Sequence, residues 1–501
     1  MNTSRTKNSF RNIFFSLANQ LITILLGFVN RSVFIWTLGV GYLGISGLFS
    51  DILTMLSLAD LGFGVALTYS MYKPLAEKDY DRLAALTGLY RRVYRIIALA
   101  VTLIGLALVP FLKYLINLKH PIPHITLYYL MFLANTVASY LVVYKTSILT
   151  ADQKDYLLKK YQSFFSIGST ACMTFFLLLT HSYLIYLLIQ VIFTYSQNFY
   201  SSYVAEKQYP FIKKHVSMPI KEVKEIFKNL YSVFLYKISG VLLNATDNTI
   251  ISIMIGTGMV GYYSNYSIIT LQVTNLVNTI FYSLTASLGN LVVREKAHRR
   301  YQVFKAIQSV SDIFSSICTA CLFLLFQDLI NVWLGNHFLL NNLTLFAIIC
   351  NFYLGVILLP IWIYREATGL YQQTKYVMVV TAIINLALSI IMAKFYGIAG
   401  VLFASVIARL LTYFWYEPVL LFKKYFNASS IHYFFSIIKN ISVTAIIVFI
   451  NRFLFSNFIV NNWGMLFIKT FSIGIFSSVI ALLFYYKTEG IKIILRKIIE
   501  R

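Results

Sequence analysis

The feature that most restricts how this chain can fold is a succession of long apolar runs. A helix needs about 20 apolar residues to cross a bilayer, whereas barrel strands alternate over about 10. Fourteen runs have the length of helices and are separated by charge clusters, Pro or Gly. We predict transmembrane helices over residues 12–38, 42–71, 89–117, 125–149, 158–180, 183–205, 227–255, 261–290, 302–330, 342–366, 375–395, 398–421, 435–456 and 462–486.

The charge content supports an all-α membrane protein. Only 12% of the 501 residues are charged, against about 25% in soluble domains, and this is too little to cover soluble domains of ordinary size. The 58% of hydrophobic residues excludes a disordered chain. The four cysteines all lie in predicted spans, which favours buried thiols over a disulfide framework, so no metal or cofactor is predicted.

The basic residues indicate how the chain is oriented in the membrane. Lys and Arg number 42 against 18 Asp and Glu, a net charge of +24 that would suggest nucleic-acid binding in a soluble protein. However, 35 of the 42 fall in the two tails or in cytoplasmic segments, which consist of alternate loops and the adjoining ends of the spans, so the positive-inside rule predicts cytoplasmic termini. Contact with membrane lipids then explains the charge, and nucleic acid is not an expected partner.

Two glycine-rich segments reveal an internal repeat. Residues 38–44, LGVGYLG, and residues 255–261, IGTGMVG, share a pattern at an offset of 217 and each follows a predicted span. Although both contain G-x-G-x-x-G, neither has the strand or soluble βαβ unit that dinucleotide binding requires. We expect a tight turn and close helix packing instead. Six spans separate the copies, so the repeats have the same orientation and substrate is expected between two lobes.

The repeat predicts the domain organisation, and the loops help to limit the function. We expect an N-terminal six-helix lobe, a cytoplasmic linker, a C-terminal six-helix lobe related to the first by a pseudo-twofold axis, and two extra helices with a basic tail, over residues 1–205, 206–226, 227–425 and 426–501 respectively. No large external loop is predicted. A membrane polymerase or ligase is therefore disfavoured, and the chain is not expected to be an enzyme.

Charged residues within predicted spans are costly and usually face a cavity or a partner, so they are candidate site residues. Arg31 and Asp60 lie in consecutive spans, where they form either a structural salt bridge or an anion site with an acid that tunes it. Arg409 lies in the middle of its span and is a candidate anion ligand, because a guanidinium binds two oxygens of a pyrophosphate at once. Arg365, near a span end, either extends to the membrane surface or is a further, weaker candidate ligand.

An acid and several uncharged polar residues in later spans extend this set of candidates. Asp247 lies near Asn244 on one face of a helix, where both act either as interhelical hydrogen-bonding groups or as a cavity site. Asp60 and Asp247 are the candidates for coupling transport to an ion, since a desolvated carboxylate takes up a proton or a cation readily. Gln272 and Asn275 belong to a polar stripe along one helix. This stripe either lines a cavity or contacts another helix.

Several segments resemble the bacterial polysaccharide repeat-unit flippases of the multidrug/oligosaccharidyl-lipid/polysaccharide exporter superfamily. The resemblance rests on residues 38–79, 247–269, 365–390 and 397–410, and it extends over roughly 10–425. It implies a fourteen-span, two-lobed transporter that moves undecaprenyl-pyrophosphate-linked oligosaccharides across the cytoplasmic membrane by ion-coupled alternating access. A cationic cavity is typical of this family, as is an acid at the position of Asp60.

The resemblance implies a role in capsular or exopolysaccharide assembly, with a polysaccharide polymerase and glycosyltransferases as expected partners. Two alternatives stay open on the sequence. One is a flippase for the peptidoglycan precursor or for a teichoic or teichuronic glycan, which shares the same mechanics. The other is a cation-coupled multidrug exporter of the same fold, which predicts an acidic cavity and is disfavoured by the intramembrane arginines.

Overall fold

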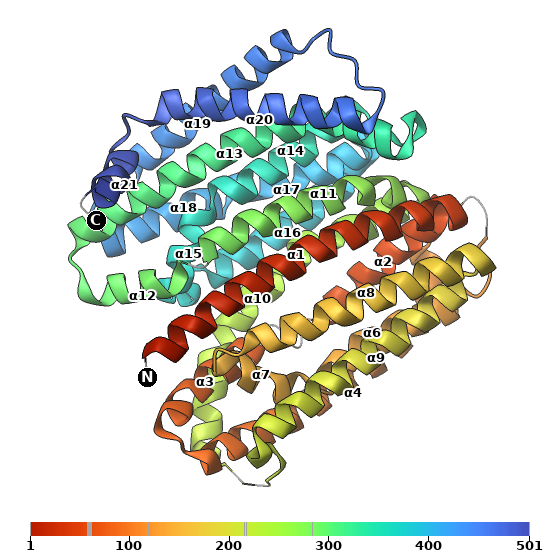
Figure 1. Cartoon of the computed structure of the whole chain (residues 1–501), viewed down its shortest axis with the longest axis vertical. Helices are drawn as coiled ribbons and strands as arrows, with labels where there is room; N and C mark the ends of the chain where they lie inside the picture. Colours follow the sequence, from red (N-terminus) through yellow and green to blue (C-terminus); the bar gives the residue numbers. More distant parts are fainter. Residues whose placement is uncertain are drawn as a thin grey trace. The chain divides into compact units, whose positions relative to one another are not determined.

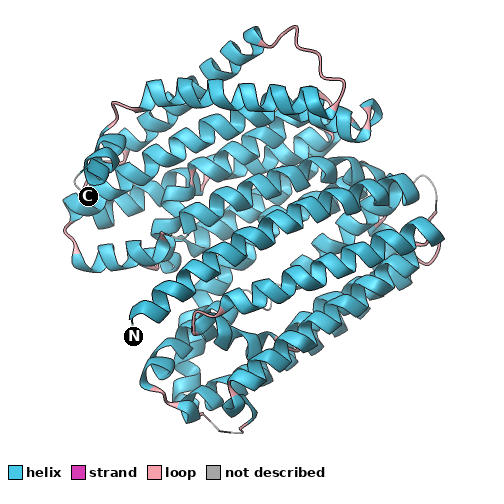
Figure 2. Cartoon of the chain, viewed as in Figure 1, coloured by secondary structure: helices cyan, strands magenta, loops and turns pink. Residues whose placement is uncertain are grey.

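The chain is helical throughout the part that the structure describes. The computed structural model describes residues 2–57, 63–118, 121–214, 216, 218–282 and 284–499. Within these ranges it contains no strand (Figure 2). The predicted all-α membrane class is confirmed, and the chain divides into two compact units, Met1–Gly261 and Tyr262–Arg501. The lobe boundaries predicted from the repeat stay a prediction.

The helices follow one another with short connections (Figure 1). Those of the first unit are α1 (Asn2–Leu38), α2 (Val40–Leu56), α3 (Phe63–Glu77), α4 (Tyr80–Leu108), η2 (Val109–Phe111), α5 (Leu112–Leu115), α6 (Ile125–Tyr140), α7 (Val143–Ala151), α8 (Asp155–Thr180), α9 (Tyr183–Gln208), η3 (Pro210–Lys213) and α10 (Ile220–Met254). Helix α11 (Thr257–Tyr282) begins in the first unit and continues into the second. The second unit then contains α12 (Thr285–Arg294), α13 (Ala297–Leu334), η4 (Asn336–Phe338), α14 (Asn342–Ile357), α15 (Leu359–Thr368), α16 (Tyr371–Tyr396), α17 (Ile398–Leu411), α18 (Tyr413–Leu421), the π-helical η5 (Phe422–Phe426), α19 (Ile431–Leu454), α20 (Trp463–Tyr485) and α21 (Glu489–Ile499).

Within the described residues, each predicted apolar run coincides with one helix or with two or three consecutive helices. Among the described residues, eight helices are long and apolar enough to cross a membrane. The number is ten if two bent pairs, α6–α7 at 47° and α14–α15 at 43°, each count as one span. Pro360 stands at the start of α15, where a missing N–H is tolerated and the preceding helix ends. The total of fourteen spans is compatible with this fold and stays a prediction.

The two glycine-rich segments form equivalent turns. Gly39 connects α1 to α2 with a φ of 80°, and Gly256 connects α10 to α11 with a φ of 139°. Side chains rarely tolerate positive φ, and glycine adopts it without penalty. The two residues are 217 positions apart, so the repeat read from the sequence is a structural repeat at these turns.

The last glycines of the two segments bring the repeats into contact within the first unit. A β-carbon on Gly44 would overlap the carbonyl oxygen of Thr257, and one on Gly261 would overlap that of Val40. Val40 and Thr257 are also equivalent under the 217-residue offset, so the contact is reciprocal, as in a two-fold interface. The close packing predicted for these glycines is confirmed.

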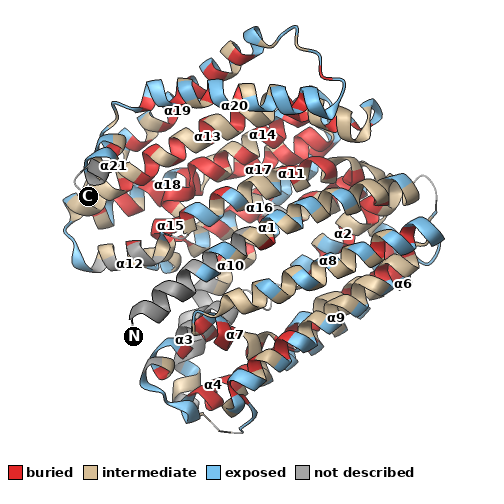
Figure 3. Ribbon diagram, in the orientation of Figure 1, coloured by how far each residue is buried: buried red, intermediate tan, exposed pale blue. Residues whose placement is uncertain are grey.

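The burial pattern is that of helices surrounded by lipid. Large apolar side chains such as Trp36, Phe164 and Phe449 are exposed, while others are packed inside each unit (Figure 3). In a soluble protein so much exposed apolar surface would favour aggregation. In the first unit α8 packs against both α1 and α9, and in the second α13 packs against α14, α19, α20 and α21. These two groups of helices carry the polar side chains described next.

Candidate functional site

Asn30 and Arg31, two adjacent polar residues of α1, lie against α9. The Asn30 side-chain amide donates a hydrogen bond to the Tyr186 hydroxyl at 2.7 Å. Arg31 is half-buried and interacts electrostatically with the same hydroxyl. The ring of Tyr186 packs edge-on against Phe34, one turn further along α1, with 5.2 Å between the ring centroids. Arg31 therefore lies in a polar environment fixed by α9, as expected for a candidate ligand within a span.

Two of the predicted site residues cannot be compared with the structure in full. Asp60 lies outside the described residues, so both predictions for the Arg31–Asp60 pair stay predictions. Asn244 lies within α10, but its side chain is outside the described part of the chain. Asp247, on the same helix, is buried, with 9% of its surface exposed. Its role in ion coupling stays a prediction.

An acid that the sequence analysis did not select lies near Asp247. The Asp51 side chain on α2 is hydrogen-bonded to the side chain of Asn248 on α10. Asn248 occupies the repeat position equivalent to Arg31. The contact thus joins α2 to α10, and it uses an amide at the position where the first repeat has a cation. Asp51 lies inside a predicted span, and that fact alone would have singled it out.

The polar stripe of α11 runs along the helix from buried to exposed positions. Asn265 is fully buried, Gln272 and Asn275 are half-buried, and Thr279 is exposed. The Thr279 hydroxyl donates to the Asn275 carbonyl oxygen one turn earlier, at 2.8 Å. The side chains follow a single helical face, as the spacing predicted. Their role as cavity lining stays a prediction.

The arginines of the second unit lie in different surroundings. Arg409 is buried on α17 and interacts electrostatically with Tyr413 on α18. Arg365 donates from one guanidinium nitrogen to both carboxylate oxygens of Glu417, at 2.9 and 3.2 Å. Both partners are at least nine-tenths buried, so the expectation that Arg365 reaches the membrane surface is wrong. A buried carboxylate opposite the guanidinium holds it inside, since separating the pair leaves an uncompensated charge.

Lys469, another cation within a predicted span, is also paired. Its ammonium group lies 2.7 Å from a carboxylate oxygen of Asp328 and joins α20 to α13.

The second unit also contains a larger polar cluster, here called the Asn440 cluster. In this cluster the amide of Asn440 donates to the Asp312 carbonyl oxygen and to the Ser316 and Tyr485 hydroxyls, and its oxygen accepts from Ser315 and Tyr353. The cluster joins α13, α14, α19 and α20.

The predicted residues are divided between the two units. Arg31 and Asp247 lie in the first, and Gln272, Asn275 and Arg409 lie in the second. That they share one cavity stays a prediction. Among the described residues, no group of three or more His, Cys, Asp or Glu could hold a metal ion.

The sequence matches a family model described as polysaccharide biosynthesis protein over residues 9–285, which is more than half of the chain. This region contains most of α1 and all of α2 to α11, with Arg31, Asp247, Gln272 and Asn275. No curated protein matches the sequence.

The fold is similar to those of several solved transporters. A structure described as the lipid II flippase MurJ in an inward closed conformation matches 97% of this chain and 100% of its own, with 18% identity and a TM-score of 0.71. An inward-facing multidrug resistance MATE family transporter of the MOP superfamily matches 79% of this chain and 93% of its own, with 12% identity and a TM-score of 0.60. The MATE transporter VcmN of Vibrio cholerae in the bent form matches 82% and 95%, with 16% identity and a TM-score of 0.55. At these identities the similarity is one of fold.

Proposed function

Since the chain belongs to the polysaccharide biosynthesis protein family, we propose that it is a flippase for oligosaccharides linked to undecaprenyl pyrophosphate. It moves repeat units for capsular or exopolysaccharide assembly across the cytoplasmic membrane. Both termini face the cytoplasm in this proposal, as the distribution of basic residues indicates. Glycosyltransferases supply the substrate and a polysaccharide polymerase consumes it.

The observation that carries the proposal is Arg31, a cation inside the membrane-spanning helix α1 and within the region that matches the family. Placing a guanidinium there costs several kcal/mol of insertion free energy, roughly 2.5–3.5 on insertion scales, so it indicates a function. An arginine suits a lipid pyrophosphate because its planar fork can donate two hydrogen bonds to phosphate oxygens. Arg409 is the second candidate ligand, in the other unit.

Transport against a gradient needs a source of energy, and the acids supply a candidate. Asp60 and Asp247 are the proposed coupling residues, and each would take up a proton or a sodium ion in one state of an alternating-access cycle. Asp51 joins them as a third candidate, because it is hydrogen-bonded to the neighbour of Asp247. Replacement of each acid by its amide, followed by transport with and without an ion gradient, would identify the one that couples.

The decisive experiment deletes the gene and locates the lipid-linked repeat unit. The proposal expects the unit to accumulate in the cytoplasmic leaflet, where a membrane-impermeant reagent that oxidises glycans cannot reach it in intact cells. Lysed cells should show the full amount. Normal labelling of the unit in intact cells of the deletion strain would refute the proposal.

A second candidate is a flippase for the peptidoglycan precursor, favoured by the similarity to the lipid II flippase structure over 97% of this chain. In that case loss of the gene should block cell-wall synthesis. Any loss of surface polysaccharide should then be an indirect consequence of that block. A multidrug exporter is also compatible with the fold. It predicts that overexpression confers resistance to cationic dyes, which a cation-lined site disfavours.

A further inference from the structure

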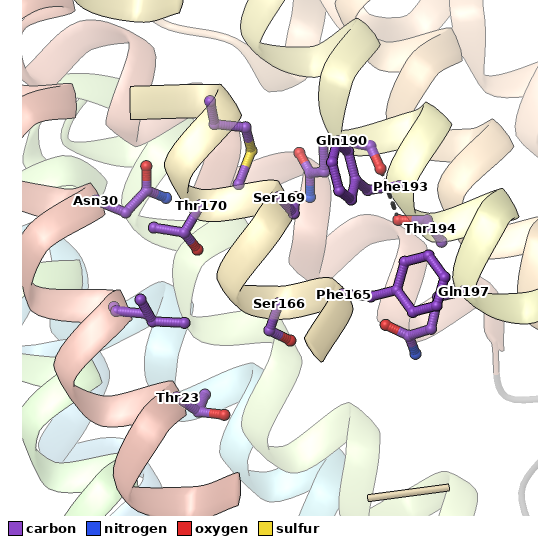
Figure 4. Close-up of a pocket in the computed structure, with 13 residues that line it drawn as sticks. Thr23, Asn30, Phe165, Ser166, Ser169, Thr170, Gln190, Phe193, Thr194 and Gln197 are labelled. Atoms are coloured by element: carbon purple, nitrogen blue, oxygen red, sulfur yellow. Dashed lines mark hydrogen bonds between the residues drawn. The ribbon is translucent and has the colours of Figure 1, made fainter. Parts of the chain in front are cut away.

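The first unit contains a pocket of about 270 Å³ between α1, α8 and α9. We call it the α1–α8–α9 pocket. Its volume is close to the lower end of ligand pockets, which span about 300–1,000 Å³. Figure 4 shows polar side chains from all three helices around it, Asn30 from α1, Ser166 and Ser169 from α8, and Gln190 and Gln197 from α9. It is thus a polar space among helices that also face lipid.

Several of these polar groups are not used within the protein. Among the described residues, the side chains of Ser166, Ser169 and Gln197 have no hydrogen-bond partner. The side-chain amide oxygen of Asn30 is also buried without one. In a lipid environment an unsatisfied polar group is costly, because no bulk water replaces the missing partner. These groups therefore need water or a ligand in the pocket.

The chemistry of the lining selects the ligand. None of the residues that line the pocket is charged, so a cationic drug or a bare phosphate would find no counter-ion there. Amides and hydroxyls both donate and accept, which suits a ligand with many hydroxyl groups. Phe165 and Phe193 add two aromatic rings to the lining (Figure 4), and such rings offer apolar faces for contact with the C–H groups of a sugar ring.

We propose that the α1–α8–α9 pocket binds a neutral sugar ring of the transported oligosaccharide. This inference rests on the proposed function and adds a subsite to it. Arg31 directly follows the pocket residue Asn30 in α1, so the cation for the pyrophosphate and the amide for the sugar are adjacent in one helix. The substrate has the same order of groups, a pyrophosphate joined to sugars. The pocket thus confers preference for a glycosylated lipid over the bare lipid.

The test compares two ligands that differ only in the glycan. The native lipid-linked oligosaccharide is extracted from the deletion strain, and undecaprenyl pyrophosphate, which lacks the glycan, is the second ligand. Binding of each to the full-length protein in nanodiscs is measured by native mass spectrometry. The wild-type protein should bind the glycosylated lipid on the order of tenfold more tightly, from a few added hydrogen bonds. The Ser169→Val/Gln190→Leu double variant should lose this preference and keep its affinity for undecaprenyl pyrophosphate.

Ser196→Val is the matched control, because Ser196 lies on α9 but is exposed and does not line the pocket. It should keep the preference. If the double variant does not fold, as judged by loss of affinity for the bare lipid, Gln197→Leu replaces it. Equal binding of both lipids by the wild-type protein, or an undiminished preference in the pocket variant, would overturn the sugar subsite and leave the flippase proposal standing. Failure of the wild-type protein to bind either lipid would overturn the flippase proposal itself.

Discussion

The α1–α8–α9 pocket and the Asn440 cluster are built from the same kinds of side chain and yet differ in how these are satisfied. In the cluster, both polar atoms of the Asn440 amide have partners, and the five hydrogen bonds measure 2.7 to 3.2 Å. In the pocket, Ser166, Ser169 and Gln197 have no partner within the described part of the protein. Uncharged polar residues in these membrane helices therefore serve two purposes: they join helices where their hydrogen bonds are satisfied, and they are available to a ligand where hydrogen-bonding capacity remains open.

The Arg365–Glu417 ion pair resembles the Asn440 cluster, because its charged groups are partnered within the protein. Both side chains are buried, and the guanidinium contacts both carboxylate oxygens. Such a pair fixes α15 against α18. The comparison thus separates groups that hold the second unit together from groups that are available to a ligand in the first. Replacing groups of the first kind should therefore cost free energy of unfolding, and replacing groups of the second kind should not.

Breaking the buried pair should have the largest effect. The Arg365→Met substitution leaves the Glu417 carboxylate buried without its cation, and such changes cost about 3–5 kcal/mol. We expect a large fall in thermal stability in nanodiscs. The double variant Arg365→Met/Glu417→Met should recover much of the loss, because no charge remains uncompensated. Wild-type stability in the single variant would show that the pair does not hold these helices together.

The Asn440→Leu substitution should have the next largest effect. Interhelical hydrogen bonds in membrane proteins contribute about 0.6 kcal/mol each on average, so losing five should cost about 3 kcal/mol. Gln190→Leu in the pocket is the matched change, and it should alter stability by less than about 0.5 kcal/mol, since Gln190 contributes no side-chain hydrogen bond to another described residue. Thermal unfolding of both variants checks the comparison. Equal losses in the two would remove the distinction between a saturated cluster and an open pocket.

Changing the candidate anion ligands should affect transport more than stability. Arg31→Ala and Arg409→Ala should each lower export of the repeat unit, by an amount on the order of tenfold or more if the guanidinium binds a phosphate. Lys469→Ala is the control, because Lys469 is paired with Asp328. Export is measured as surface polysaccharide per amount of folded protein in the membrane. Equal export by all three variants would contradict the cationic site.

The sequence predicted the helices better than the contacts between them. Within the described residues every long apolar run proved to be helical, because run length alone distinguishes such helices. Close helix packing at Gly44 and Gly261 also followed from a repeated pattern, but their contact with each other's repeat was seen only in the structure. By contrast, Arg365 and Glu417 are 52 positions apart, and no local rule connects them.

The sequence contains a pattern that could have predicted the pocket. Its residues recur every three or four positions, at 166, 169, 170 and 173 on α8 and at 190, 193, 194 and 197 on α9. This spacing marks one face of each helix. The pattern is weak in the sequence, because these positions carry no charge and include the apolar Met173 and Phe193. That the two faces meet depends on the packing of α8 against α9, which the sequence does not contain.

The smallest effect of breaking an ion pair is expected for a partly exposed pair at the end of α9, which extends the comparison to a charge that water can reach. Glu206 lies 2.6 Å from Lys145 and 3.4 Å from Lys213, and its hydrogen bond with Lys145 is the main reason that its pKa is lowered from 4.5. A carboxylate with a lowered pKa in the folded state contributes stability above about pH 4.5 and loses it as the pH falls through the folded-state pKa. Glu206→Gln should therefore cost less than about 1 kcal/mol at pH 7, and this difference from the wild type should vanish in acid. Thermal unfolding between pH 7 and pH 3.5 measures it, and a difference that persists or grows as the pH falls would show that the loss comes from packing and not from the charge.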